Sequence, residues 1–127
     1  MVKLDHLTLA VRDWKVSRDW YVGHLGFKVE FEIPQGGASG FGVAAIQDDA
    51  GFTVFLEQFD EQILSGQSSY TIQVEDVDAL FARLSTSGLK FVAKPGKHFW
   101  GYGAILADPD GHLLHLYDET SMKEKGS

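Results

Sequence analysis

Hydrophobic and polar residues alternate in short runs along most of this chain, and glycine, proline and aspartate separate the runs. A period of two is typical of strands that bury one face. In the first half the alternation predicts strands at 4–11, 28–33, 41–47 and 52–58. A helix is predicted at 14–22, with Asp13 as its N-cap and the glycines at 23 and 26 closing it.

The second half repeats this order of elements. The pattern predicts strands at 70–74, 90–93, 102–107 and 112–117, and a helix that starts at 75–78 and continues to 86. Two turn signals separate the last three strands, a Pro-Gly-Lys loop at 95–97 and the Asp-Pro-Asp-Gly turn at 108–111. The chain therefore contains two βαβββ units joined by a linker near 60–67.

The two units also align by hydropathy. A shift of 63 positions aligns residues 11–13 with 74–76, and a shift of 58 aligns 55–58 with 113–116. Paired sheets of this kind make a cup lined by the inward side chains. We expect an α+β fold in which two βαβββ modules, about 3–59 and 68–118, pair their sheets within one domain at 1–119. Residues 120–127 are expected to form a disordered tail.

Composition restricts the function. A length of 127 residues fits one domain, and the absence of cysteine excludes disulfides, thiolate nucleophiles and zinc–thiolate sites. The net charge of −7 and the lack of a basic run argue against nucleic acid and anionic membranes as partners. There is no membrane-length apolar stretch and no signal-peptide pattern at the N-terminus, so a cytoplasmic protein is expected.

Several motifs together resemble the vicinal oxygen chelate superfamily of glyoxalases, bleomycin resistance proteins and extradiol dioxygenases. They are Leu-Asp-His-Leu-Thr-Leu-Ala-Val-Arg-Asp at 4–13, Trp-Tyr at 20–21, Leu-Gly-Phe at 25–27, Trp-Gly at 100–101 and Asp-Pro-Asp-Gly-His at 108–112. The resemblance implies the two-module cup, a homodimer and a small-molecule substrate or ligand. It also implies one of two activities, a metal-dependent lyase, isomerase or dioxygenase, or a metal-free protein that sequesters a small molecule.

The resemblance further implies four metal-ligand positions, on the first and last strand of each module. They are occupied here by His6, Glu57, Ser69 and His115. Strand alternation puts His6, Glu57 and His115 on the inward face, where they would bind Fe, Mn, Zn, Ni or Co as a divalent ion. Ser69 is a poor ligand, which favours the metal-free alternative. Each histidine alone could equally be a hydrogen-bonded pocket residue, and Glu57 could face solvent.

The remaining candidates would contact the substrate. Glu57, released from the metal, is a candidate proton shuttle, and His98 in the predicted loop is a candidate general acid or base. The predicted substrate-binding residues are Phe55, Ser69, Trp100, Tyr102 and Tyr117, although aromatic residues at such positions can also belong to the core. Few basic residues lie near the cup, which favours a neutral or weakly acidic, partly aromatic ligand with vicinal oxygens over glutathione conjugates or fosfomycin.

Overall fold

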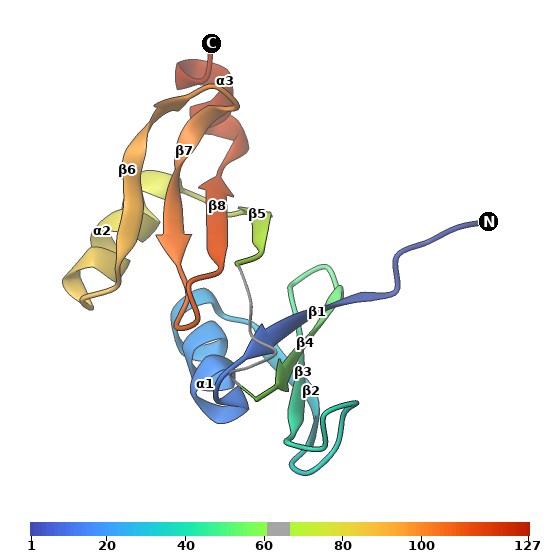
Figure 1. Cartoon of the computed structure of the whole chain (residues 1–127). Helices are drawn as coiled ribbons and strands as arrows, with labels where there is room; N and C mark the ends of the chain where they lie inside the picture. Colours follow the sequence, from blue (N-terminus) through green and yellow to red (C-terminus); the bar gives the residue numbers. More distant parts are fainter. Residues whose placement is uncertain (61–66) are drawn as a thin grey trace. The chain divides into compact units, whose positions relative to one another are not determined.

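The computed structural model describes residues 1–60 and 67–127, which form two compact units, Met1–Gly66 and Gln67–Ser127 (Figure 1). The first unit contains β1 (His6–Val11), α1 (Trp14–Leu25), β2 (Lys28–Ile33), β3 (Val43–Gln47) and β4 (Thr53–Gln58). The second contains β5 (Ser69–Gln73), α2 (Val77–Thr86), β6 (Phe91–His98), β7 (Gly101–Ala107), β8 (Leu113–Tyr117) and α3 (Glu119–Lys125). The predicted α+β class with two four-stranded sheets is confirmed.

Both sheets have the same topology. Their strand orders are β1-β4-β3-β2 and β5-β8-β7-β6. The first and last strands of each unit pair in parallel, and the other neighbours pair antiparallel. The predicted linker at 60–67 lies almost entirely outside the described residues.

One face of each sheet carries the core of its unit. In the first unit, Leu9 and Val11 of β1, Ile46 of β3 and Leu56 of β4 are all at most 4% exposed, and α1 contacts β3 and β4. In the second unit the corresponding layer comes from β7, β8 and α2, and its fully buried members are Val77, Leu84, Ala104, Leu106, Leu114 and Leu116. Burying one such leucine or isoleucine contributes about 1.5–3 kcal/mol.

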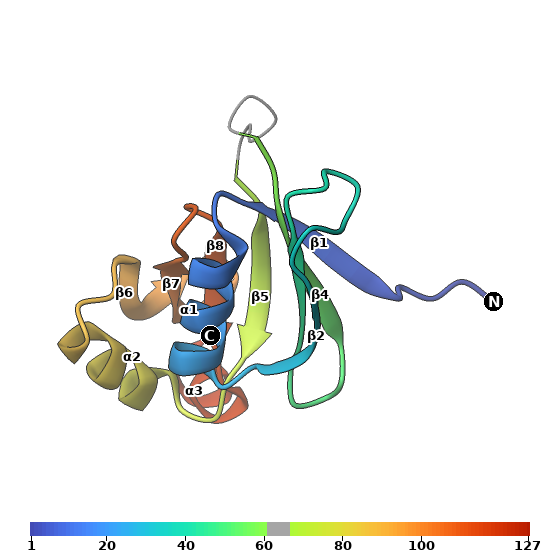
Figure 2. The same ribbon diagram turned by 90° about the horizontal axis from the view of Figure 1, so that it is seen from below.

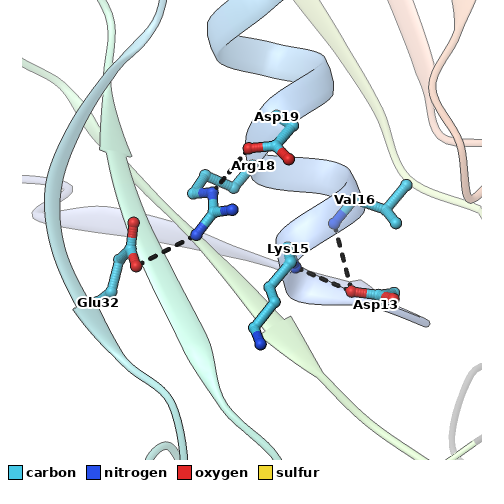
Figure 3. Close-up of polar contacts among 6 residues, drawn as sticks. All are labelled: Asp13, Lys15, Val16, Arg18, Asp19 and Glu32. Carbon is cyan, nitrogen blue, oxygen red and sulfur yellow. Dashed lines mark hydrogen bonds and ion pairs between the residues drawn. The ribbon is translucent and has the colours of Figure 1, made fainter.

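The start of α1 is fixed by side-chain contacts (Figure 3). The Asp13 carboxylate accepts hydrogen bonds from the backbone N–H groups of Lys15 and Val16, as an N-cap residue does. Arg18 forms ion pairs with Asp19 at 2.9 Å and with Glu32 on β2 at 3.2 Å, so it joins the helix to the edge strand. The predicted cap is confirmed, and the helix ends at Gly26, which adopts the left-handed conformation.

Three differences from the sequence predictions are larger than a boundary shift of two residues. α1 continues through Gly23 to Leu25. β6 continues through the predicted 95–97 loop to His98, with register irregularities that accommodate Pro95 on an edge strand. The segment expected to be a disordered tail forms α3, with Asp118 as its N-cap. No helix in the described ranges is long and apolar enough to cross a membrane.

Candidate functional site

The first unit has a sheet face opposite the core layer, which we call the first helix-free face. The β1–β4 ladder pairs His6 with Thr53, Thr8 with Phe55, and Ala10 with Glu57. Side chains alternate along a strand, so these six residues share one face. β3 adds Ala45, which is the ladder partner of Phe55. The predicted orientation of His6 and Glu57, away from the core leucines, is confirmed.

Aromatic rings occupy the middle of the first helix-free face. The Phe55 ring stacks on the His6 imidazole with centroids 4.1 Å apart and an interplanar angle of 23°. Phe31 of β2 contacts Phe55 edge to face at 5.7 Å and remains 39% exposed. The sequence interpretation did not include Phe31, although its alternation with Ile33 gives a signal for this face. A register shift between Val29 and Phe31 places Val29 opposite Ile46 of the core layer instead. The face therefore presents a stacked imidazole–phenyl pair with a further exposed ring.

Glu57 lies at the far end of this face and is only 7% exposed. Its Oε2 accepts a hydrogen bond of 2.9 Å from the backbone N–H of Ser39. The Ser39 hydroxyl donates to the carbonyl of Gln58 at 2.6 Å. In Figure 2 the loop that carries Ser39 is the teal segment beside the end of β4. The Glu57 carboxylate thus holds the β2–β3 loop against the sheet.

The predicted metal ligands do not come together within the first unit. Glu57 lies four ladder positions beyond the residue opposite His6, which is about 13 Å along the strands. Ligands of one ion must approach it to about 2–2.5 Å. Within each described unit, no three His, Cys, Asp or Glu side chains are grouped as a metal site requires. The donors of the first unit therefore do not fit a shared metal ion.

If Glu57 anchors the β2–β3 loop, its substitution should lower the stability of the protein. Glu57→Ala leaves the Ser39 N–H without its acceptor in a nearly buried position, and we expect the free energy of unfolding to fall by about 1–3 kcal/mol. Glu57→Gln keeps an acceptor oxygen and should cost less. Urea titration measures both, and hydrogen exchange at the Ser39 amide reports the local opening. Unchanged stability in Glu57→Ala would contradict this role.

The second unit has an equivalent face, which we call the second helix-free face. The β5–β8 ladder pairs Ser69 with Leu113, Thr71 with His115, and Gln73 with Tyr117. The Tyr117 hydroxyl donates to Gln73 Oε1 at 3.3 Å. His115 contacts the Trp100 indole edge to face at 5.5 Å. Ser69, at the start of β5, is exposed.

The registers of the two ladders correct the internal alignment. Thr53 pairs with His6, the first residue of β1, and Leu113 pairs with Ser69, the first residue of β5. Thr53 and Leu113 therefore hold equivalent positions in the two ladders. Phe55 is therefore the first-unit counterpart of His115, and Glu57 is the counterpart of Tyr117. The shift of 58 positions is wrong by two residues for the last strand of each unit. An aromatic ring, not a carboxylate, occupies the position that His115 holds in the second unit.

Tyr102 does not lie on the second helix-free face. Its hydroxyl donates to Asp78 Oδ1 on α2 at 2.7 Å, and Lys125 of α3 lies over its ring at 5.0 Å. The predicted inward placement of Tyr102 is therefore wrong, because β7 alternation turns it toward the helices, with Ala104 and Leu106. Its substrate-binding role stays a prediction. The Asp78 hydrogen bond raises the pKa of the Tyr102 phenol.

A cavity of about 390 Å³ lies at the start of α1 and contains none of the predicted site residues. It is lined by Asp13, Trp14, Lys15, Pro34, Gln35, Phe41 and Gln58. The Asp13 carboxylate there is already occupied by two backbone N–H groups, and Gln58 Oε1 accepts from the Trp14 N–H. The cavity therefore adds none of the predicted residues, and each helix-free face is a candidate site by itself.

Comparisons with known proteins agree with this architecture. The family model described as Glyoxalase/Bleomycin resistance protein/Dioxygenase superfamily matches residues 3–116. The crystal structure of TnmS3, an antibiotic binding protein from Streptomyces sp. CB03234, is 26% identical, with 92% of this chain and 96% of that chain covered and a TM-score of 0.75. A superfamily member from Sphaerobacter thermophilus DSM 20745 is 21% identical, with 93% and 98% covered and a TM-score of 0.75.

A curated relative is similarly distant. The uncharacterized protein YetH of Bacillus subtilis (strain 168) is 21% identical over 111 residues, which are 87% of this chain and 92% of the relative. The match spans nearly the full length of both proteins. It carries no information on a ligand or a reaction.

Proposed function

Because the chain belongs to the glyoxalase/bleomycin resistance protein/dioxygenase superfamily, we propose that it binds a small, flat, partly aromatic molecule without needing a metal ion. One observation carries the proposal. Phe55 occupies the ladder position in the first unit that His115, a predicted metal ligand, holds in the second, and its ring stacks on the His6 imidazole. An imidazole packed on a phenyl ring offers a stacking surface for a flat ligand.

Other features support binding over metal chemistry. Glu57 holds the β2–β3 loop, and Ser69 contributes a poor ligand at the start of β5. Phe31 and Phe55 provide partly exposed aromatic surface on the first helix-free face, and Trp100 does so in the second unit. TnmS3 is an antibiotic binding protein, and the proposal extends ligand binding, without the ligand's identity, to this chain.

A direct binding assay tests the proposal. Riboflavin is a neutral flat aromatic probe, and anilinonaphthalene sulfonate is an anionic one. We expect riboflavin to bind with a Kd in the micromolar range, and to bind more tightly than the sulfonate because the protein carries a net charge of −7. Isothermal titration calorimetry measures both affinities. A chelator in the buffer should leave the riboflavin affinity unchanged.

Two variants connect binding to the proposed face. Phe55→Ala should weaken riboflavin binding about tenfold through the lost stacking and contact area. Phe41→Ala, which removes a half-exposed phenyl ring from the β2–β3 loop, is the matched control and should bind as the unmodified protein does. Absence of binding by the unmodified protein would refute the proposal. Binding that requires an added divalent ion, and that His6→Ala abolishes, would instead favour the metal-dependent alternative.

A further inference from the structure

The β6–β7 hairpin places three aromatic residues in different environments. His98 pairs with Gly101 in the ladder, so Phe99 and Trp100 form the turn between the strands. Phe99 is fully exposed and Trp100 is half-buried. The turn therefore directs Phe99 away from the sheet and returns Trp100 to it.

Three neighbours restrict the Trp100 indole. The His98 imidazole lies parallel to it, with centroids 5.0 Å apart and an interplanar angle of 7°. His115 of β8 contacts it edge to face at 5.5 Å. A Cβ atom on Gly103 would lie 2.6 Å from Trp100 Cη2, so the indole lies over a position that only glycine leaves free. Trp100 is thus held in one orientation before any ligand arrives.

A hydrogen bond fixes the ring of His98 in turn. Its Nε2 lies 3.2 Å from the carbonyl oxygen of Gly103. A carbonyl oxygen only accepts hydrogen bonds, so Nε2 carries the proton and donates it. Nε2 therefore donates its hydrogen bond to the backbone of β7, and this bond fixes the orientation of the imidazole plane. Gly103 therefore lies next to both rings. Its carbonyl oxygen accepts the hydrogen bond from His98, and its lack of a Cβ atom leaves space for the Trp100 indole.

We infer that His98 is a positioning residue. It stacks on Trp100 and, through Gly103, fixes the indole as a rigid surface on which a flat ligand packs. The inference rests on the proposed function and replaces the role of general acid or base predicted for His98. The ligand class it implies is a planar ring system, because a preoriented indole favours partners that stack on it at little cost in conformational entropy.

Fluorine NMR of protein labelled with fluorotryptophan tests the positioning without any ligand. The chain has three tryptophans, and Trp100→Phe identifies the Trp100 resonance. His98→Ala should shift and broaden this resonance. His98→Phe keeps a ring for stacking and should leave it sharp, and Phe99→Ala is the matched control at the neighbouring exposed position. A Trp100 resonance that is the same in His98→Ala and in the unmodified protein would overturn the inference.

Riboflavin titration then tests whether the orientation of Trp100 affects the affinity for the ligand. His98→Ala should weaken binding about two- to tenfold, the range expected from an aromatic pair, and His98→Phe should restore it. Loss of binding in His98→Phe with an unchanged Trp100 resonance would overturn the inference, because His98 would then contact the ligand itself. If the unmodified protein binds no riboflavin, the proposed function fails, and the NMR comparison still decides whether His98 positions Trp100.

Discussion

Asp118→Ala is expected to lower the free energy of unfolding by about 2–5 kcal/mol, because two backbone N–H groups lose a buried acceptor. Asp118 is 2% exposed. Its Oδ1 accepts from the N–H of Ser121 in α3 at 2.6 Å, and its Oδ2 accepts from the N–H of Val77 in α2 at 2.7 Å. One carboxylate therefore stabilises the first turns of two helices. Urea unfolding followed by circular dichroism measures the loss.

Asp76→Ala is the matched control for this substitution. Asp76 is the exposed N-cap of α2 and accepts one hydrogen bond, from the N–H of Ala79 at 3.0 Å. Its loss should cost about 1 kcal/mol. Equal effects of the two substitutions would contradict the double-acceptor role of Asp118.

The same carboxylate predicts a dependence of stability on pH. Burial, the largest single influence, raises the pKa of Asp118, but the hydrogen bonds from Ser121 and Val77 together bring it below its ordinary value of 3.8. A group with a lowered folded-state pKa stabilises the protein above its unfolded-state pKa, and this contribution is lost as the pH falls through the folded-state value. The stability difference between the unmodified protein and Asp118→Asn should therefore shrink below about pH 4. A difference that grows on acidification would contradict the lowered pKa.

Gly42→Ala is expected to destabilise the first unit by about 3 kcal/mol or more, through backbone strain and overpacking. Gly42 has a φ of 120°, and a Cβ there would lie 2.3 Å from Nε1 of Trp14 and 2.7 Å from the carbonyl oxygen of Pro34. The Trp14 side chain does not move aside easily, because it is only 4% exposed. The backbone at Gly42 does not shift easily either, because it is hydrogen-bonded to Gly36 and Gln58.

Gly23→Ala is the control for this effect of an added methyl group. Gly23 lies inside α1, and nothing is within 4 Å of the position a Cβ would take. Alanine there should stabilise the protein by about 0.5–1 kcal/mol. Thermal unfolding compares the two variants directly. Similar unfolding temperatures for Gly42→Ala and Gly23→Ala would contradict the prediction, because the loop at Gly42 would then accommodate a methyl group without loss of stability.

Most of the fold could be predicted because the strands alternate cleanly and the turns carry strong local signals. The errors occurred where tertiary contacts override those signals. Pro95 indicates a loop, yet pairing with β7 keeps the segment in an edge strand. The polar segment after residue 118 has no apolar pattern. It becomes helical through the Asp118 cap, the ion pair of Lys125 with Asp78, and a hydrogen bond from the Tyr102 N–H to Met122 Sδ.

The candidate site was predicted in part, for a related physical reason. Strand side chains repeat with a period of two, so a shift by two residues leaves every residue on its correct face. Hydropathy therefore identified the face of Glu57 and Phe55 but not which of them corresponds to His115. Only the ladder registers decide that position. The hydrogen bond from His98 to Gly103 likewise depends on the pairing of β6 with β7.

The parallel pairing of the first and last strands has a consequence for how such a chain can arise. In each unit the first and the last strand are neighbours in one sheet. A segment of this kind can be duplicated in tandem with only a short connection, because no strand must be exchanged between the copies. This parallel pair also joins the two strands that are farthest apart along the sequence of the unit. We expect this ladder to form late in folding, after the local antiparallel hairpins.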